Sequence, residues 1–187
     1  MQTRKHIKIA ASLLTLVLAA CSRPAPYAPA APAAAAAPAA DAVEGQEQAN
    51  LANFDDLDYN VFSGQKWDDF PKSHAADIVV HWPDGRTTTG LETHIADLKQ
   101  MFVYAPDTRI KQHPIKIAQG SYTAVAGVME GTFSAPMPTP DGKTIAPTNK
   151  AFKLDMVTIG RWENGVMQEE WLFWDNQAFM KQIGLGQ

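Results

Sequence analysis

The sequence predicts an α+β domain in which helices come first and a curved antiparallel sheet packs on them. Two observations support this prediction. Apolar residues recur at helical spacing in the segments 51–61 and 91–102, and from residue 109 onward short apolar stretches alternate with turns. A curved sheet wrapped around helices encloses a cavity, and a functional site on such a fold is expected there.

The helices of the first half follow from the spacing of apolar residues. Leu51, Phe54, Leu57 and Val61 define one apolar face, and aspartates occupy positions between them. Further elements are expected as a short helix around Trp67, a strand over 78–82 that ends at the turn 83–85, and a helix over 91–102.

The second half predicts three or four strands. They cover residues 109–118, 122–133, 151–161 and 166–175. Gly120-Ser121 and Asn164-Gly165 are dipeptides typical of tight hairpins. The proline-rich segment 134–148 predicts a long loop, and residues 176–183 predict a closing helix.

The N-terminal segment predicts an export signal. Arg4, Lys5 and Lys8 precede an apolar stretch that ends in small residues at Cys21, the single cysteine of the chain. This stretch is too short to cross about 30 Å of hydrocarbon as a stable helix. The segment Leu18-Ala19-Ala20-Cys21 resembles the bacterial lipobox, which implies that residues 1–20 are a lipoprotein signal peptide and that Cys21 becomes lipidated.

The lipobox resemblance implies a protein anchored to the membrane of the bacterial cell envelope by acyl chains such as palmitate. Ser22 follows the cysteine where aspartate could stand, which favours the outer membrane with the domain facing the periplasm. Ordinary cleavage before Cys21, without lipid, is the alternative. Residues 21–43 form the tether, because positions 22–40 contain eleven Ala and five Pro and so favour an extended spacer. The domain itself is expected over 44–187.

Composition excludes several functions. Removal of residues 1–20 leaves 13 Lys and Arg against 20 Asp and Glu, a formal charge of −7, so nucleic-acid binding is not expected. Lipidation of Cys21 leaves no thiol for catalysis, disulfides or metal binding. His74, His94 and His113 show no metal-ligand spacing, and neither a metal nor another cofactor is expected.

Several short motifs occur in the order and spacing of one family. Residues 165–171 correspond to a Gly-Lys-Ile-x-Glu-His-Trp run, residues 77–81 to an Asp-Val-Val-x-His strand, and residues 131–143 to a Gly-x-Phe…Pro-Thr-Gly-Lys segment. Over residues 50–185 the chain therefore resembles the SnoaL-like polyketide cyclase and ester cyclase family, within the nuclear-transport-factor-2-like superfamily. This resemblance implies a cone-shaped α+β barrel with a ligand cavity.

The same resemblance places Asp155 at the position of the acid–base aspartate of the cyclases. A carboxyl group in an apolar pocket has a raised pKa, which suits it to move a proton beside a carbonyl group. Met129, however, stands where the family has a supporting histidine. Both phases of the strand 151–161 contain apolar residues, so alternation does not decide whether Asp155 faces the pocket or solvent.

The other candidate residues are aromatic or apolar. His81 is expected either to orient a substrate and pass a proton or to pack as an ordinary histidine. Trp171, Phe102, Phe133 and Met129 are expected to line the cavity or the core. If they line the cavity, they favour a small apolar or aromatic ligand.

Three functions follow from this reading. The first is a cofactor-free cyclase, isomerase or hydrolase that acts on a small carbonyl compound through Asp155. The second is a non-catalytic binding domain that uses the same cavity. The third is an envelope scaffold whose sheet face pairs with another protein, or with a second copy as a homodimer, because both phases of residues 151–159 are apolar.

Overall fold

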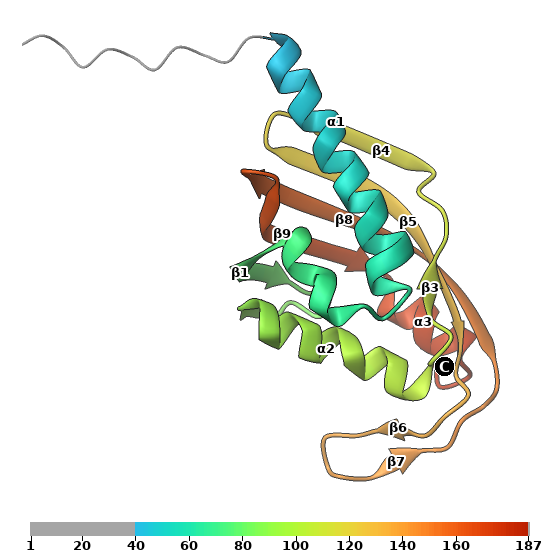
Figure 1. Cartoon of the computed structure of the whole chain (residues 1–187). Coiled ribbons are helices and arrows are strands. Elements are labelled where there is room, and N and C mark those ends of the chain that lie inside the picture. The colour runs from blue at the N-terminus through green and yellow to red at the C-terminus, as the bar shows by residue number, and fades with distance from the viewer. Residues whose placement is uncertain (1–39, 187) are drawn as a thin grey trace, which may run out of the picture. The chain divides into compact units, whose positions relative to one another are not determined.

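The computed structural model describes residues 40–186 (Figure 1). The signal sequence, Cys21 and the tether up to residue 39 lie outside the described residues, so the predictions made for them stay predictions. Among residues 40–186, no helix combines the length and the apolar character that crossing a membrane requires.

The order of elements confirms the predicted α+β class. The first half contains α1 (Ala40–Asp56), the π-helical turn η1 (Leu57–Phe62), the 3₁₀ helix η2 (Trp67–Lys72), β1 (His74–His81), β2 (Thr87–Thr89) and α2 (Leu91–Tyr104). The second half contains β3 (Arg109–Ile110), β4 (Ile115–Gln119), β5 (Tyr122–Thr132), β6 (Met137–Pro138), β7 (Thr144–Ile145), β8 (Ala151–Glu163), β9 (Val166–Trp174) and α3 (Asn176–Gln182).

Two segments differ from the prediction. The stretch expected as one strand over 109–118 is divided into β3 and β4, both of which pair with β5. Residues 111–114 form no strand there, although the backbone oxygen of Gln112 still accepts from Val128 N of β5 at 3.1 Å. Pro114 has no amide hydrogen to donate to a neighbouring strand. The segment 134–148, expected as a loop, contains the short hairpin of β6 and β7.

The main sheet has the strand order β2-β1-β9-β8-β5-β3, and β4 also pairs with β5. β1 and β9 run parallel, while the other paired strands of this sheet run antiparallel. The expected antiparallel sheet therefore contains one parallel pair, which places the first strand beside the last. Figure 1 shows that the sheet curves around the helices.

The inner face of the sheet is defined by alternation along β8. The even-numbered positions from 152 to 162 are buried, and the odd-numbered positions from 151 to 163 are exposed or partly exposed. α1 covers the inner face at β4 and β5, and the Phe54 ring centroid lies 6.5 Å from that of Trp162. α2 packs on β1. The helices and the inner face thus form the walls of a cavity.

The hairpin predicted at Asn164-Gly165 joins β8 to β9. Both residues have positive φ, 51° and 80°. A two-residue turn of this kind needs positive φ at both positions, because its twist then matches that of the strands. The sequence signal for this turn is confirmed.

Asp175 begins α3. Its Oδ1 accepts hydrogen bonds from the backbone N–H groups of Gln177 (2.8 Å) and Ala178 (2.9 Å). We expect Asp175→Ala to lower the free energy of unfolding by about 1 kcal/mol, measured by urea denaturation, because these N–H groups lose their acceptor. Asp175→Asn keeps the accepting oxygen and is the control. Equal losses in both variants would contradict the capping role.

Candidate functional site

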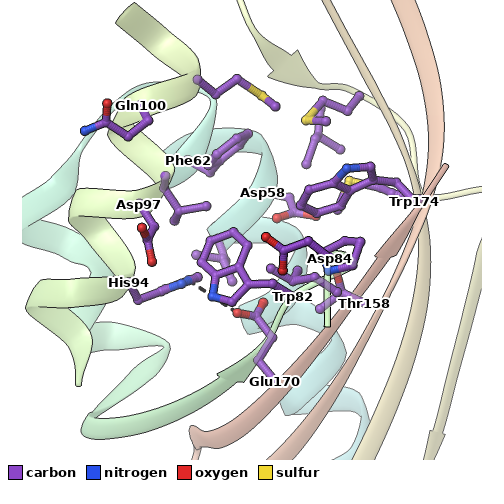
Figure 2. A pocket seen from close by; sticks show the side chains of 18 of the residues that line it. Asp58, Phe62, Trp82, Asp84, His94, Asp97, Gln100, Thr158, Glu170 and Trp174 are labelled. Carbon is purple, nitrogen blue, oxygen red and sulfur yellow. Dashed lines mark ion pairs between the residues drawn. The ribbon is translucent and has the colours of Figure 1, made fainter. Parts of the chain in front are cut away.

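A cavity of about 200 Å³ lies between the inner face of the sheet and the helices (Figure 2). Much of its wall is apolar and is formed by Met101, Met129, Met156, Leu172 and Trp174. Pockets for drug-sized ligands typically measure about 300–1,000 Å³. The cavity therefore suits a small and largely apolar molecule.

One wall of the cavity contains a buried polar cluster of His74, His94 and Glu170, called here the His–His–Glu cluster. The three residues come from β1, α2 and β9 and are 2%, 2% and 4% exposed. Glu170 Oε2 lies 3.3 Å from His94 Nε2 and 3.9 Å from His74 Nε2. Figure 2 shows the side chains of His94 and Glu170 directed toward each other.

The His–His–Glu cluster is not satisfied by its own hydrogen bonds. His74 Nε2, His94 Nδ1 and Glu170 Oε2 are buried without a hydrogen-bond partner among residues 40–186. A buried polar atom without a partner costs about 1–3 kcal/mol. A site that receives a polar group or an ion explains this arrangement better than a purely structural core does.

Burial dominates the electrostatics of this cluster. It raises the pKa of Glu170 to about 8, and the nearby charge of Asp58 adds to the rise. It lowers the pKa of His94 to about 3, with a further contribution from the positive charge of Arg86. Burial, together with His94, also lowers the pKa of His74 well below its ordinary value. At neutral pH both imidazoles are uncharged.

Asp58 lines the cavity from η1 and begins a hydrogen-bonded chain that leads to the surface. Its Oδ2 lies 2.8 Å from His113 Nε2, and His113 Nδ1 lies 2.7 Å from Asp55 Oδ1. Asp55 Oδ2 accepts from Lys116 Nζ at 2.6 Å. The His113 side chain is fully buried and stacks on Tyr59 with 4.5 Å between ring centroids. Asp58, His113 and Asp55 are called here the Asp–His–Asp chain.

The Asp–His–Asp chain favours the protonated form of its imidazole. Burial alone would lower the pKa of His113, but the hydrogen bonds to Asp58 and Asp55 outweigh this effect and raise the pKa. Each ring nitrogen faces a carboxyl oxygen, so in the protonated form both N–H groups donate. Burial raises the pKa of Asp58, although the hydrogen bond from His113 opposes the rise. Asp58 therefore presents a carboxyl group of raised basicity to the cavity.

Comparison with models of protein families shows to which family the chain belongs. The model of the family described as SnoaL-like polyketide cyclase matches residues 42–183. The chain belongs to the SnoaL-like polyketide cyclase family. The resemblance found in the sequence motifs is thereby confirmed. No curated protein sequence gives a significant match.

Solved structures of low sequence identity share the fold of this SnoaL-like chain. IdmH from Streptomyces antibioticus is 21% identical, with a TM-score of 0.62 over 72% of this chain and 98% of its own. A SnoaL-like polyketide cyclase from Agrobacterium tumefaciens is 16% identical, with a TM-score of 0.55 over 74% and 98%. A ketosteroid isomerase-like protein from Catenulispora acidiphila, solved with trimethylamine, is 15% identical, with a TM-score of 0.57 over 73% and 92%. These likenesses establish the cone-shaped fold.

Within this SnoaL-like fold, Asp155 lies on the outer face of the sheet. It is exposed and belongs to the odd-numbered phase of β8, whereas Met156 and Thr158 of the other phase line the cavity. This differs from the expectation that Asp155 faces the pocket. The physical reason is the two-residue period of a strand: once the even-numbered side chains pack inward, Asp155 must point outward.

His81 and Trp171 also lie away from the cavity lining. Their rings stack with 5.1 Å between centroids, and His81 Nε2 lies 2.9 Å from Glu169 Oε1. His81 Nδ1 is 3.2 Å from Thr87 Oγ1. Neither residue lines the cavity, which β9 lines instead with Glu170, Leu172 and Trp174. The expectation that Trp171 forms a pocket wall is not met, because the opposite face of β9 is the inner one.

Of the remaining expected lining residues, Met129 faces the cavity and is 3% exposed. Phe102 and Phe133 are buried in the core outside the cavity lining. Phe102 packs on Phe62 and Trp67, with ring centroids 5.2 Å and 5.4 Å apart. The apolar character of the pocket thus comes mainly from methionine, leucine and tryptophan side chains.

Sequence reasoning did not single out the acidic residues that the structure brings to the cavity. Asp58 carried a usable signal, because it follows Phe54 by four residues and precedes Val61 by three, which places it on the apolar stripe of the helix. No sequence signal pointed to His74, His94 and Glu170, since they come from three separate elements. Among the residues described, these three form a group whose donor atoms lie within 4.8 Å of one another and could hold a metal ion.

Proposed function

We propose that the chain is an acid–base enzyme that acts on a small, mainly apolar carbonyl compound, with Asp58 as the proton acceptor. The observation that supports this proposal is the Asp–His–Asp chain behind a carboxyl group in the cavity wall. Family membership supports a reaction of the cyclase or isomerase type. Asp58 thus takes the role that the sequence assigned to Asp155.

The proposed reaction starts beside the carbonyl group. Asp58 takes a proton from the neighbouring carbon, and the electron pair of the broken C–H bond forms an enolate. In an isomerisation Asp58 returns the proton to another carbon. In a cyclisation the enolate carbon attacks a second carbonyl carbon of the same molecule, and Asp58 gives the proton to the resulting alkoxide. The polar atoms of His94 and Glu170 line the same cavity and can contact the carbonyl oxygen.

His113 acts in this proposal as a positioning residue. It donates to Asp58 from Nε2 and is fixed by Asp55 through Nδ1. His113 contacts only Oδ2 of Asp58, so Oδ1 can take the proton. Because the His113 ring is buried and stacked on Tyr59, it keeps the Asp58 carboxyl group in one orientation. Orientation of a base relative to the C–H bond contributes to the rate because little freedom is lost at the moment of reaction.

The substrate can be identified by incubation of wild type and Asp58→Asn with a small-molecule extract of the source cells, read by untargeted mass spectrometry. We expect a compound that wild type consumes and Asp58→Asn spares. Asp155→Asn is the matched control, since it removes a carboxylate outside the cavity, and it should consume the compound like wild type. A compound retained unchanged by all three proteins would replace the enzyme proposal by a non-catalytic binding domain.

The proposal also includes the cell envelope as the site of action. The lipobox at Cys21 supports it, and the Ala- and Pro-rich tether would separate the domain from the outer-membrane surface. We expect cells grown with a clickable fatty acid to label wild type in the membrane fraction, and Cys21→Ser to lose both label and membrane association. Ser22→Ala is the control and should keep both. Membrane association of an unlabelled wild type would contradict lipidation.

The homodimer stays a prediction. The outer face of the sheet carries the exposed apolar side chains of Ile115, Ile117, Val157 and Phe173. Identical apolar patches can cover each other across a two-fold axis. Sedimentation equilibrium should therefore give twice the monomer mass for wild type and the monomer mass for Phe173→Asp. A monomeric wild type at high concentration would rule the homodimer out.

A further inference from the structure

We infer that the His–His–Glu cluster is a binding site for a divalent transition metal of the zinc type, open to the cavity. Two imidazoles and one carboxylate, with a further position left for a ligand, form a donor set that catalytic zinc sites use. All three side chains line the cavity, so a metal held by them would face any molecule inside it.

The tautomer of His74 supports this inference. The hydroxyl of Ser73 donates to the backbone oxygen of Phe70 at 3.2 Å, so its oxygen accepts from His74 Nδ1 at 2.8 Å. His74 Nε2 then bears a lone pair, and it lies 3.9 Å from Glu170 Oε2. This distance is too long for a hydrogen bond. A cation between the two atoms would satisfy both.

The distances suit a small metal ion. Bonds of 2.0–2.2 Å at tetrahedral angles place two donor atoms roughly 3.3–3.6 Å apart. His94 Nε2 and Glu170 Oε2 already have this separation, 3.3 Å. His74 Nε2 is slightly farther from Glu170, and a rotation of the long glutamate side chain would close the gap.

The surroundings hold the backbone of the three ligands and the ring of His74. His74, His94 and Glu170 stand on a strand, a helix and a second strand, each held by backbone pairing. The rings of His74 and His94 lie 5.3 Å and 6.2 Å from that of Phe70, measured between centroids. Ser73 orients His74 from behind, as the outer partners of metal-bound histidines do. Such support reduces the reorganisation that metal binding would need.

The charges around the His–His–Glu cluster are compatible with the binding of a cation. The Arg86 guanidinium also lines the cavity, but it is paired with Asp84 at 3.1 Å and with Asp97 at 2.8 Å. Asp58 contributes a carboxyl group to the same cavity. If the proposed function holds, the metal would polarise the carbonyl oxygen of the substrate. That use rests on the proposed function, whereas metal binding itself does not.

The test uses the mature full-length protein, purified in detergent, treated with a chelator and titrated with Co²⁺ and with Zn²⁺. We expect one equivalent of Co²⁺ to produce the d–d absorption of a four- or five-coordinate ion, and Zn²⁺ to displace it. Zn²⁺ should also raise the melting temperature of the wild type, because a ligand that binds only the folded state stabilises it.

Glu170→Gln keeps the shape of the side chain and should abolish the one-equivalent Co²⁺ spectrum. Ser73→Ala should weaken binding about 10- to 100-fold, since it removes only the partner that orients His74. His81→Gln is the matched control, because His81 also pairs with a glutamate but outside the cavity. It should bind Co²⁺ like wild type.

Absence of a one-equivalent Co²⁺ spectrum in the wild type would overturn the inference, as would a spectrum that persists in Glu170→Gln or disappears in His81→Gln. Ser73→Ala and the wild-type melting curve keep the inference testable if Glu170→Gln does not fold. None of these measurements uses turnover. A protein that binds Co²⁺ but shows no reaction dependent on Asp58 would contradict only the proposed function.

Discussion

Replacement of Asp58 by Asn is expected to lower kcat by about 10²- to 10⁴-fold on the carbonyl compound that wild type consumes, the range attributed to one general base. The amide is nearly isosteric with the carboxylate, and its oxygen can still accept from His113 Nε2. It cannot take a proton from carbon. KM should change little, because the apolar walls that hold the substrate remain intact.

The measurement is exchange of the substrate C–H for deuterium in D₂O, followed by NMR. This readout reports proton removal even when a later step limits turnover. Asp155→Asn serves as the control, since Asp155 is exposed on the outer face of β8. Exchange at the wild-type rate in Asp58→Asn, or a comparable loss in Asp155→Asn, would show that Asp58 is not the base.

The fold could be predicted from local patterns and from the order of motifs, because both can be read from the sequence without knowledge of tertiary contacts. Asn164-Gly165 indicated the hairpin, and its positive φ angles bear this out. The parallel pairing of β1 with β9 had no such signal, because it joins segments from the two ends of the domain. Long-range pairing of this kind depends on the complete sheet, which a local pattern does not describe.

The choice between the two faces of β8 depends on the whole length of the strand. Asp155, Val157 and Ile159 share one phase, and Leu154 and Met156 share the other. Over residues 154–159 both phases are partly apolar. Over the whole strand, however, the odd-numbered phase carries Lys153, Arg161 and Glu163 besides Asp155, and the even-numbered phase carries no charged residue. The structure resolves this through Trp162, which is buried against Phe54 of α1 and belongs to the even-numbered phase. The contact lies far from Asp155 in sequence, yet it fixes the direction of that side chain.

The polar residues of the cavity illustrate a second limit of prediction from the sequence. Asp58 could have been found by its helical spacing from Phe54, but an aspartate within an amphipathic helix is usually read as part of the solvated face. His74, His94 and Glu170 meet only after a strand, a helix and a second strand have assembled. A metal-ligand motif with short spacing is therefore not a requirement for a donor set of this type.

Replacement of His113 by Ala is expected to lower the free energy of unfolding by about 3–5 kcal/mol, because Asp58 remains buried without its charged partner. The stack on Tyr59 is lost as well. His81→Ala is the matched control: its pair with Glu169 has a similar distance, 2.9 Å, but its side chain is 34% exposed. That variant should lose less than about 1 kcal/mol. Equal losses in both variants, measured by urea denaturation, would show that burial of the His113 pair adds no stability.

The stability that the buried pair contributes should also fall as pH rises. The pKa of His113 is raised above its ordinary 6.5 by Asp58 and Asp55, and the pKa of Asp58 is raised by burial. A raised pKa means that the folded state binds the proton more tightly than the unfolded chain. The His113 contribution is therefore complete below pH 6.5 and is lost as pH rises through the raised pKa.

This dependence can be isolated in a Glu170→Gln background, because burial and Asp58 raise the pKa of Glu170 to about 8, within the same pH range. Glu170→Gln is compared with the triple variant Asp58→Asn/His113→Gln/Glu170→Gln, in which neither member of the pair titrates. From pH 6.5 upward, the difference in free energy of unfolding between the two proteins should shrink as His113 loses its proton. A difference that stays constant or grows over this range would mean that His113 is not held as a cation between Asp58 and Asp55.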